Sequence, residues 1–355
     1  MRRCVGEKRA KEENKRKMEG TESKKMNIVY ASDENFAEML SVSMESLLTH
    51  NKNVVVYVLN NGIKEKSVEK LKRQAERHER EIHFVPLKNL KEYAGRELSC
   101  QSKISLTAYF RLFMPQILPL SVEKLLYLDC DTMVRKDLTD LWERKFDGCA
   151  AVAEPTAPLM KEKIGLKKSD YYFNSGVLLV NLKKWREEKI MEKFVKYMEE
   201  MGGDVSFEDQ GVINHVLKNE ISILPFKYNV TTQFFDFGYD GFSMMKKDEV
   251  RYERNEVEAG LENPGIVHFT NSFASERPWV KGCEHKYANE WRQYKKNTEW
   301  SDSPLWKSNK DFARKISRII YSILKGNMRY LFIYFANGII RPKISSGGRR
   351  GKLSK

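Results

Sequence analysis

The sequence predicts an α/β protein built on a parallel sheet, and three observations support this fold class. Short apolar segments typical of buried strands alternate with amphipathic segments typical of helices from residue 27 onward. A chain of 355 residues is long enough for one large α/β core with an appended tail. Polar and acidic residues directly follow several strand segments, and ligands of parallel sheets bind beyond the carboxyl ends of the strands.

The first elements alternate regularly. Apolar segments predict strands, and the charged amphipathic segments between them predict helices that cross from one parallel strand to the next. Ser32 or Asp33 is placed to cap the first helix, because both side chains accept hydrogen bonds from free backbone amides. The predicted elements are strands at 28–31, 54–59 and 82–87, a helix that ends near residue 50, and a helix at 64–80.

The later elements are longer and more apolar. The segment at 171–182 starts polar and becomes continuously apolar, which is typical of a strand buried on both faces. The predicted elements are a largely buried helix at 104–117, strands at 124–128, 149–153, 171–182 and 266–269, and helices at 183–201 and 207–217.

Charge divides the chain into three parts. The formal net charge is +14, but the first 25 residues carry +5 and residues 306–355 carry +12, which leaves −3 for the segment between them. A slightly acidic body argues against a nucleic-acid groove, whereas basic ends fit an anionic surface. We therefore expect a disordered basic lead-in at 1–25, one globular domain at 26–300 and a basic tail at 301–355.

Cysteine usage and hydropathy bear on the cellular compartment. The five cysteines are odd in number and contain no CxxC pair, so neither a disulfide framework nor a structural zinc site is indicated. No apolar segment approaches the roughly 18 residues needed to cross a bilayer, and the N-terminus lacks the apolar centre of a secretion signal. We therefore expect a cytoplasmic protein. The cysteines are Cys4, Cys100, Cys130, Cys149 and Cys283.

An acidic pair ends one of the apolar strands. Because side chains alternate across a strand, Asp129 and Asp131 are expected to project to the same side while Cys130 points away. Two such carboxylates repel each other unless a cation lies between them, and they suit Mg²⁺ or Mn²⁺. The pair alone also fits a strand that runs into an acidic turn. His268 ends a later strand and is either structural or a third ligand, since imidazole suits Mn²⁺ better than Mg²⁺.

Other polar residues have two interpretations each. Arg111 lies in a largely buried segment, so its guanidinium requires an anion, which is either an ion-pair partner within the fold or a ligand. Residues 174–176 are either a turn or a backbone that a ligand can approach closely. Glu208 and Asp209 begin a helix, where carboxylates also serve as dipole partners. Residues 31–35 contain neither a dinucleotide-binding fingerprint nor a P-loop lysine, which disfavours those chemistries.

Together these segments resemble the family 8 glycosyltransferases, particularly the bacterial galactosyl- and glucosyltransferases of lipopolysaccharide-type glycan assembly. The resemblance covers about residues 26–295 and keeps the family's order and closely similar spacing. The segments that carry it are 27–35, 109–112, 126–131, 172–177, Asp209 with Gln210, and His268 with 277–279.

The resemblance implies a GT-A fold, which is Rossmann-like, and a UDP-sugar donor. It implies Mn²⁺, with Mg²⁺ as the alternative, held by Asp129, Asp131 and His268 together with the donor diphosphate. The implied nucleotide-binding residues are Ala31, Ser32, Asp33, Asn35, Cys130 and Arg277. The implied donor-sugar residues are Arg111, Asn174, Ser175, Asp209 and Gln210, and Glu154 falls on the acceptor side.

The family retains anomeric configuration. Two-step retention needs a carboxylate nucleophile close under the anomeric carbon, and the matching residue here, Gln210, is an amide. We therefore expect front-face attack by the acceptor hydroxyl, with the departing phosphate oxygen taking the proton. In this mechanism Gln210 stabilises the oxocarbenium-like centre and Asp209 binds sugar hydroxyls.

Two functional hypotheses follow from the resemblance. The first is a retaining, Mn²⁺-dependent transferase that moves galactose or glucose from UDP-galactose or UDP-glucose to a glycan or lipid-linked acceptor. The second is a catalytically inactive, membrane-associated assembly protein that binds sugar nucleotides. Its support is that Asn271 and Arg277 stand where the family has glycine and lysine. Nucleotidyl transfer is a third hypothesis, but it would need a basic loop at the acidic segment 31–35.

The C-terminal segment 312–341 interleaves apolar and basic residues. This pattern fits either an amphipathic helix packed on the body or a helix that lies in a membrane interface. Because the family's acceptors include lipid-linked glycans, we expect the second. The protein is then cytoplasmic and peripheral on the inner face of the cell membrane, where the tail meets anionic lipid and no nucleic acid is bound.

Overall fold

The computed structural model describes residues 25–95, 106–246, 250–272, 274–308, 320–321, 323–324 and 326–335. These residues form an α/β body with one seven-stranded sheet and one three-stranded sheet. In spatial order, the strands of the large sheet are β3 (Glu81–Pro86), β2 (Val54–Asn60), β1 (Met26–Ser32), β4 (Lys124–Leu128), β7 (Phe173–Asn181), β6 (Cys149–Ala153) and β8 (Ile221–Ile223).

The N-terminal half follows the predicted alternation. β1 pairs in parallel with β2 and with β4, and β2 pairs in parallel with β3. The connecting helices are α2 (Ala37–His50) and α3 (Glu65–Arg77). The cap predicted at residues 32–33 is Asp33, whose side chain accepts hydrogen bonds from the backbone amides of Asn35 and Phe36 at the start of a 3-10 turn.

The parallel pairing predicted for the sheet does not extend to β7. This strand runs antiparallel to both β4 and β6, between which it lies. Its residues are all buried except Asn181, as expected for a central strand. The direction was not predictable, because a continuous apolar run reports burial on both faces and carries no information on strand direction.

The small sheet brings distant segments together. It consists of β5 (Thr132–Val134), β10 (Ile266–His268) and β9 (Val230–Thr231), with β10 in the middle. β5 follows the acidic pair directly, and its antiparallel register places His268 opposite Thr132. The pairing therefore joins residues that are more than 130 positions apart in the sequence.

Two predicted helices are interrupted. Residues 104–117 are not one α-helix: the described part is a 3-10 helix at Leu106–Phe113 followed by α5 (Met114–Ile117), which starts anew with Pro115 in its first turn. Residues 183–201 form α8 (Leu182–Glu187) and α9 (Ile190–Glu200), separated at Lys189, whose φ of 53° is left-handed.

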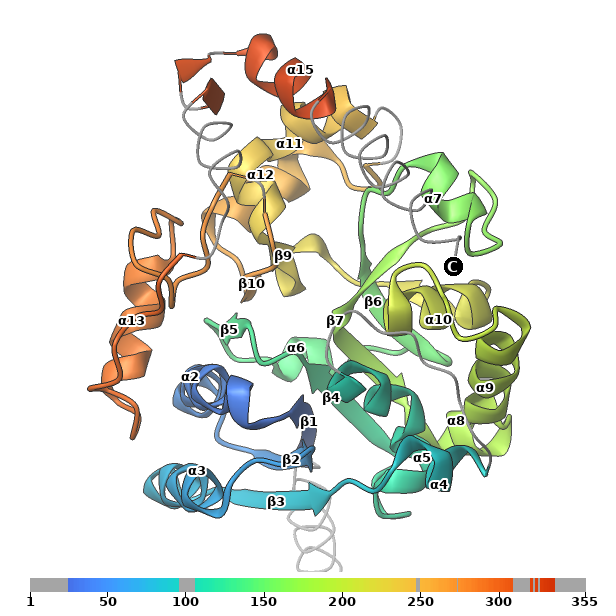
Figure 1. The fold of residues 1–355 in the computed structure, drawn as a ribbon, viewed down its shortest axis with the longest axis vertical. Coiled ribbons are helices and arrows are strands. Elements are labelled where there is room, and N and C mark those ends of the chain that lie inside the picture. The colour runs from blue at the N-terminus through green and yellow to red at the C-terminus, as the bar shows by residue number, and fades with distance from the viewer. Residues whose placement is uncertain are drawn as a thin grey trace, which may run out of the picture.

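The predicted helix at 207–217 is confirmed as α10 (Glu208–Leu217), and α15 (Asn327–Phe335) lies within the C-terminal segment where an amphipathic helix was expected. Further helices were not predicted. Figure 1 shows that α11, α12 and α15 lie beyond the small sheet, on the side away from β3. The remaining helices are α4 (Leu90–Ala94), α6 (Thr139–Trp142), α7 (Pro158–Glu162), α11 (Thr232–Lys246), α12 (Arg254–Glu262) and α13 (Ala288–Lys296).

The chain beyond residue 300 contacts the body where it is described. Trp306 forms an isolated parallel bridge with Val280, and Tyr321 donates a hydrogen bond to the backbone of Asp236. α15 packs on α11. Within the described ranges no helix is both long and apolar enough to cross a membrane. The lead-in 1–24, the segment 309–319 and residues 336–355 lie outside the described residues.

Candidate functional site

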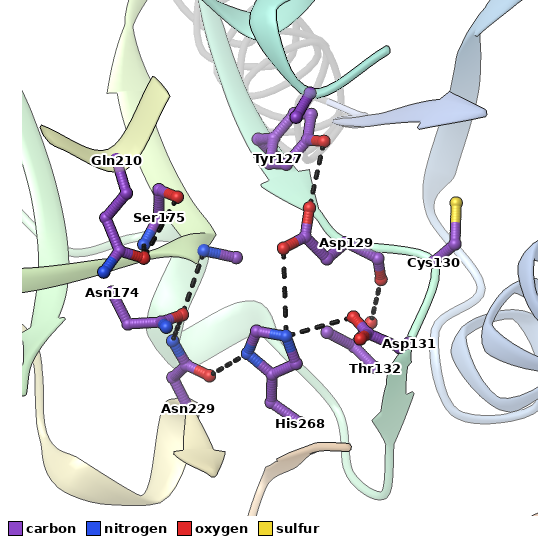
Figure 2. Close-up of polar contacts among 12 residues, drawn as sticks. Tyr127, Asp129, Cys130, Asp131, Thr132, Asn174, Ser175, Gln210, Asn229 and His268 are labelled. Atoms are coloured by element: carbon purple, nitrogen blue, oxygen red, sulfur yellow. Dashed lines mark hydrogen bonds and ion pairs between the residues drawn. The ribbon is translucent and has the colours of Figure 1, made fainter. Parts of the chain in front are cut away.

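Three side chains meet where β4 ends and the small sheet begins. One ligand atom from each of Asp129, Asp131 and His268 lies within 4.8 Å of the others. The Nε2 atom of His268 is 3.0 Å from Oδ1 of Asp131 and 3.8 Å from Oδ2 of Asp129 (Figure 2). Cys130 points away, and its Sγ donates to the carbonyl oxygen of Ala31 at 3.3 Å. The predicted divergence of Cys130 from the two carboxylates is therefore observed. However, β4 ends at Leu128, and these three residues lie in the turn to β5, where the backbone amide of Thr132 donates to the carbonyl of Asp129 at 3.1 Å.

The carboxylates and the imidazole stabilise one another's charged forms. Burial opposes ionisation of Asp131, but the neighbouring His268 and Arg277 outweigh it and lower the pKa of this carboxyl. Burial likewise opposes protonation of His268, but the charge and hydrogen bond of Asp131 raise the pKa of the imidazole. The carboxyl of Asp131 is thus kept ionised, which is the form that can ligate a metal ion.

Two asparagine side chains, Asn229 and Asn174, form a hydrogen-bonded network on the Nδ1 side of the His268 ring. Its Nδ1 lies 3.0 Å from Oδ1 of Asn229, and Nδ2 of Asn229 donates to Oδ1 of Asn174 at 2.9 Å. The same oxygen of Asn174 accepts the backbone amide of Gly176 at 3.0 Å. Asn229 was missed in the sequence, because an isolated asparagine before a two-residue strand carries no signal.

The ring of His268 also rests directly on Gly176. A Cβ at this position would lie 2.2 Å from Cε1 of His268 and 2.7 Å from Oδ2 of Asp129. Only glycine leaves room for both ligand side chains, so the backbone of β7 forms the floor of the site.

The donor set fits a divalent metal ion. Two carboxylates and one imidazole are suitable ligands for Mn²⁺, and Mg²⁺ accepts the carboxylates more readily than the imidazole. A ligating histidine usually donates its other ring N–H to a neighbouring group, and the bond from His268 to Asn229 supplies this support. The residues present can therefore hold the predicted ion.

Arg111 is an internal ion-pair residue. Its Nη2 lies 2.8 Å from Oδ1 of Asp129, its Nε lies 3.0 Å from Oδ2 of Asp209, and its Nη1 donates to the carbonyl of Ser175 at 2.7 Å. The guanidinium also stacks on Tyr127, 4.4 Å from the ring centroid. Of the two alternatives for Arg111, the structure has the ion pair within the fold. The role of Arg111 toward the donor sugar, which the resemblance implies, stays a prediction.

Asp209 and Gln210 are fixed at the start of α10. Burial raises the pKa of Asp209 to about 6, although Arg111 lowers it. Oε1 of Gln210 accepts the amide of Ser175 at 3.0 Å, and its Nε2 donates to Tyr172 at 2.7 Å. Phe207 and Glu208 precede the pair with left-handed φ angles of 65° and 54°. Such strained backbone is common where a structure must position functional side chains.

Glu154 lies beside the donor-sugar candidates. Its Oε2 accepts a hydrogen bond from Nδ2 of Asn174 at 3.2 Å. The sequence placed Glu154 on the acceptor side, and the structure brings it to the site at the end of β6. Its role stays a prediction.

The remaining nucleotide-binding candidates gather at the ends of β1 and β4. Cys130 donates to the carbonyl of Ala31, and Ser32 and Asp33 follow Ala31 in the chain. The backbone amide of Asn35 donates to Oδ1 of Asp33 at 2.9 Å. All five lie beyond or beside the carboxyl end of β1, as the sequence predicted. Their contacts to a nucleotide stay predictions.

Arg277 lies on the other side of Asp131. Its Nη2 is 3.4 Å from Oδ2 of Asp131, and its guanidinium stacks on Trp279 at 5.3 Å. The Nε of Arg277 is buried and has no hydrogen-bond partner among the described residues. The feature that links Arg277 to the site is the proximity of its guanidinium to Asp131.

Comparisons with known proteins agree with this geometry. The model of glycosyl transferase family 8 matches residues 27–283. Lipopolysaccharide 1,2-glucosyltransferase of Escherichia coli (strain K12) is 28% identical over 285 residues, covering 78% of this chain and 79% of that protein. General stress protein A of Bacillus subtilis (strain 168) is 27% identical over 285 residues, covering 78% of this chain and 95% of that protein.

A solved structure also matches. The galactosyltransferase LgtC, crystallised with donor and acceptor sugar analogs, superposes with a TM-score of 0.64 at 25% identity, covering 78% of this chain and 99% of that chain. This likeness confirms the predicted GT-A fold. Since the family match spans well over half of the sequence and the six predicted segments converge on one site, the chain belongs to glycosyl transferase family 8.

Proposed function

We propose that this chain is a retaining glycosyltransferase that uses a UDP-hexose donor and Mn²⁺. The observation that carries the proposal is the cluster of Asp129, Asp131 and His268 within 4.8 Å, with Arg277 beside it. The similar proteins are named for glucosyl and galactosyl transfer, which supports galactose or glucose as the hexose and a glycan or lipid-linked acceptor.

The metal site and Arg277 would together stabilise the leaving group. A divalent ion held by the cluster would neutralise charge on the departing diphosphate as a Lewis acid. Arg277, whose guanidinium lies beside Asp131, would bind the same diphosphate, because a guanidinium forms strong charge-assisted bonds to phosphate oxygens. The inactive assembly protein was suggested by the arginine that replaces the family's lysine at position 277. Because Arg277 lies next to Asp131, this replacement keeps a cation at the site, which supports the catalytic hypothesis.

The donor-sugar side favours front-face transfer. Asp209 is buried and paired with Arg111, so its carboxylate is engaged in the fold and poorly placed to act as a nucleophile. Gln210 is held on both sides of its amide and would present that amide to the anomeric carbon. The acceptor hydroxyl would then attack from the side of the departing phosphate, whose oxygen takes the proton.

A panel of UDP-sugars tests the proposal. The full chain is incubated with Mn²⁺, Mg²⁺ or EDTA, and UDP release is measured. We expect turnover with UDP-galactose or UDP-glucose, loss of turnover in EDTA, and loss in Asp131→Asn. The control is Asp140→Asn, an exposed carboxylate on α6. UDP binding without any hydrolysis or transfer would instead support the inactive assembly protein.

We also propose a cytoplasmic protein that is peripheral on the inner membrane face. The described C-terminal residues include highly exposed apolar side chains at Ile323, Met328 and Leu331. Exposed apolar side chains among basic residues fit an anionic lipid interface. The triple change of these residues to serine should reduce flotation of the full chain with anionic vesicles, whereas Leu120→Ser should not. Undiminished flotation would contradict the proposal.

A further inference from the structure

The loop that follows β10 carries Arg277, and one residue of α11 forms hydrogen bonds to this loop. The segment between His268 and Trp279 has no regular secondary structure in its described residues. A loop of this kind does not fix the position of a terminal guanidinium by itself, because its backbone lacks the hydrogen-bonded ladder of a strand or helix. Ser308 holds the residue next to Arg277, since its hydroxyl donates to Oε1 of Glu276 at 2.8 Å. A further contact must fix the part of the loop that precedes Glu276.

Asp236 supplies that contact. Both of its carboxylate oxygens accept hydrogen bonds from the loop: Ser272 donates its hydroxyl to Oδ2, and Ser275 donates its hydroxyl to Oδ1. The backbone amide of Ser275 lies 3.3 Å from Oδ2 as well. Oxygen acceptors that carry a charge form stronger hydrogen bonds than neutral ones. One carboxylate thus ties down both serines, two and five residues before Arg277.

Asp236 is itself fixed by the fold. α11 is interrupted at Gly238, whose φ of 61° and ψ of −174° are not helical. The hydroxyl of Tyr321 donates to the carbonyl of Asp236 at 2.9 Å, and Tyr321 is buried against Phe237. The hydrogen bond from Tyr321, in the C-terminal segment, therefore helps to fix the backbone that carries the carboxylate of Asp236.

We propose that Asp236 is a positioning residue for the donor diphosphate. It acts through Ser272 and Ser275 to hold Arg277 in the place from which the guanidinium reaches a phosphate. The inference rests on the proposed function for its ligand, but the clasp of Asp236, Ser272 and Ser275 can be tested without any donor. It gives the altered loop of this chain an anchor in addition to the bond between Ser308 and Glu276.

The first experiment measures the clasp alone. Hydrogen exchange of the full-length protein is followed in peptides that cover residues 270–278. We expect Asp236→Ala, and the double change Ser272→Ala with Ser275→Ala, to speed exchange in this loop about tenfold or more. The matched control is Asp240→Ala on the same helix, which pairs with Arg254 and does not contact the loop. Exchange that is unchanged in both clasp variants would overturn the inference.

The second experiment measures UDP binding in the presence of Mn²⁺ by calorimetry. Arg277→Gln should weaken binding about tenfold, as expected for loss of one charge-assisted interaction. Asp236→Ala should weaken it by a similar factor, with Asp240→Ala unchanged. The Arg277→Gln, Asp236→Ala double variant should bind like Arg277→Gln alone, because Asp236 acts through Arg277.

The outcomes separate the two proposals. Losses that multiply to about a hundredfold in the double variant would mean that Asp236 acts independently of Arg277, and this would overturn the positioning role. UDP binding that is equal in wild type and Asp236→Ala would do the same. If the wild-type chain binds no UDP at all, the proposed function fails, and the exchange experiment still decides the clasp.

Discussion

The Nδ1 atom of His268 and the Oδ1 atom of Asn229 lie 3.0 Å apart, and both residues are buried. Because an amide oxygen can only accept, the ring must carry its hydrogen on Nδ1 for this bond to form. The Nε2 atom then faces Asp131 and Asp129, where a metal ligand is needed. One asparagine thus selects the orientation of the ligating ring.

Replacing Asn229 should weaken metal binding. In Asn229→Ala the ring of His268 loses its supporting acceptor, and we expect Mn²⁺ affinity to fall about 10- to 100-fold. Titration of free Mn²⁺ by electron paramagnetic resonance measures this directly. Asn263→Ala changes an exposed asparagine and serves as control. A folded Asn229→Ala protein with wild-type Mn²⁺ affinity would contradict the role of Asn229.

Adding one methyl group at Gly176 should damage the same site sterically. The new Cβ would lie 2.2 Å from Cε1 of His268, so the ring must move away from Asp129 and Asp131. We expect Gly176→Ala to lose about tenfold or more in Mn²⁺ affinity while the circular dichroism spectrum remains native. Retained Mn²⁺ binding would show that the ring can shift without cost.

Removing the buried guanidinium should destabilise the fold. Arg111→Met leaves Asp129 and Asp209 without their shared cation, and breaking a buried ion pair on one side costs about 3–5 kcal/mol. Urea denaturation measures the change. Adding Asp209→Asn should restore part of the loss, because one uncompensated charge is removed. Arg73→Met, at an exposed pair with Glu299, should cost much less. Equal losses in the two arginine variants would contradict this account.

His285 should make stability depend on pH. Burial lowers the pKa of His285 from 6.5 to about 4, so the folded protein keeps this imidazole neutral where the unfolded chain takes up a proton. Protonation therefore favours the unfolded state, and its contribution to stability is complete above pH 6.5 and is lost as the pH falls toward 4. The loss approaches about 3 kcal/mol.

The pH effect is measured as a difference between variants. His285→Gln should flatten the dependence of the free energy of unfolding on pH between 6.5 and 4, while His83→Gln, which is half exposed, should leave it unchanged. Parallel curves for wild type and His285→Gln would contradict the assignment.

Features that depend on neighbouring residues could be predicted from the sequence. The strand β4 follows from the apolar run before Asp129, which is a local property. The direction of Cys130 was expected from alternation along this strand, but residues 129–131 lie in the turn between β4 and β5. The strands and helices of the N-terminal half follow from hydrophobic periodicity in the same way. The break between α8 and α9 was missed because a single left-handed residue, Lys189, leaves the periodicity almost intact.

Features that depend on partners far away in the sequence required the structure. The direction of β7, the partners of Arg111, the asparagine behind His268 and the clasp by Asp236 all involve contacts between segments that the sequence places far apart. Burial and charge indicated that Arg111 and His268 need partners, but they do not specify which residues those are.

The sequence alone thus determined the α/β class, the strand that precedes Asp129 and Asp131, and the set of residues that the family resemblance selects. Only the tertiary structure decided how these residues meet. Antiparallel pairing of β10 with β5 places His268 against the acidic pair, and β7 lies beneath them with Gly176 as its point of contact. The physical reason is that periodicity and composition encode burial, whereas register and packing between distant strands fix the distances on which metal binding depends.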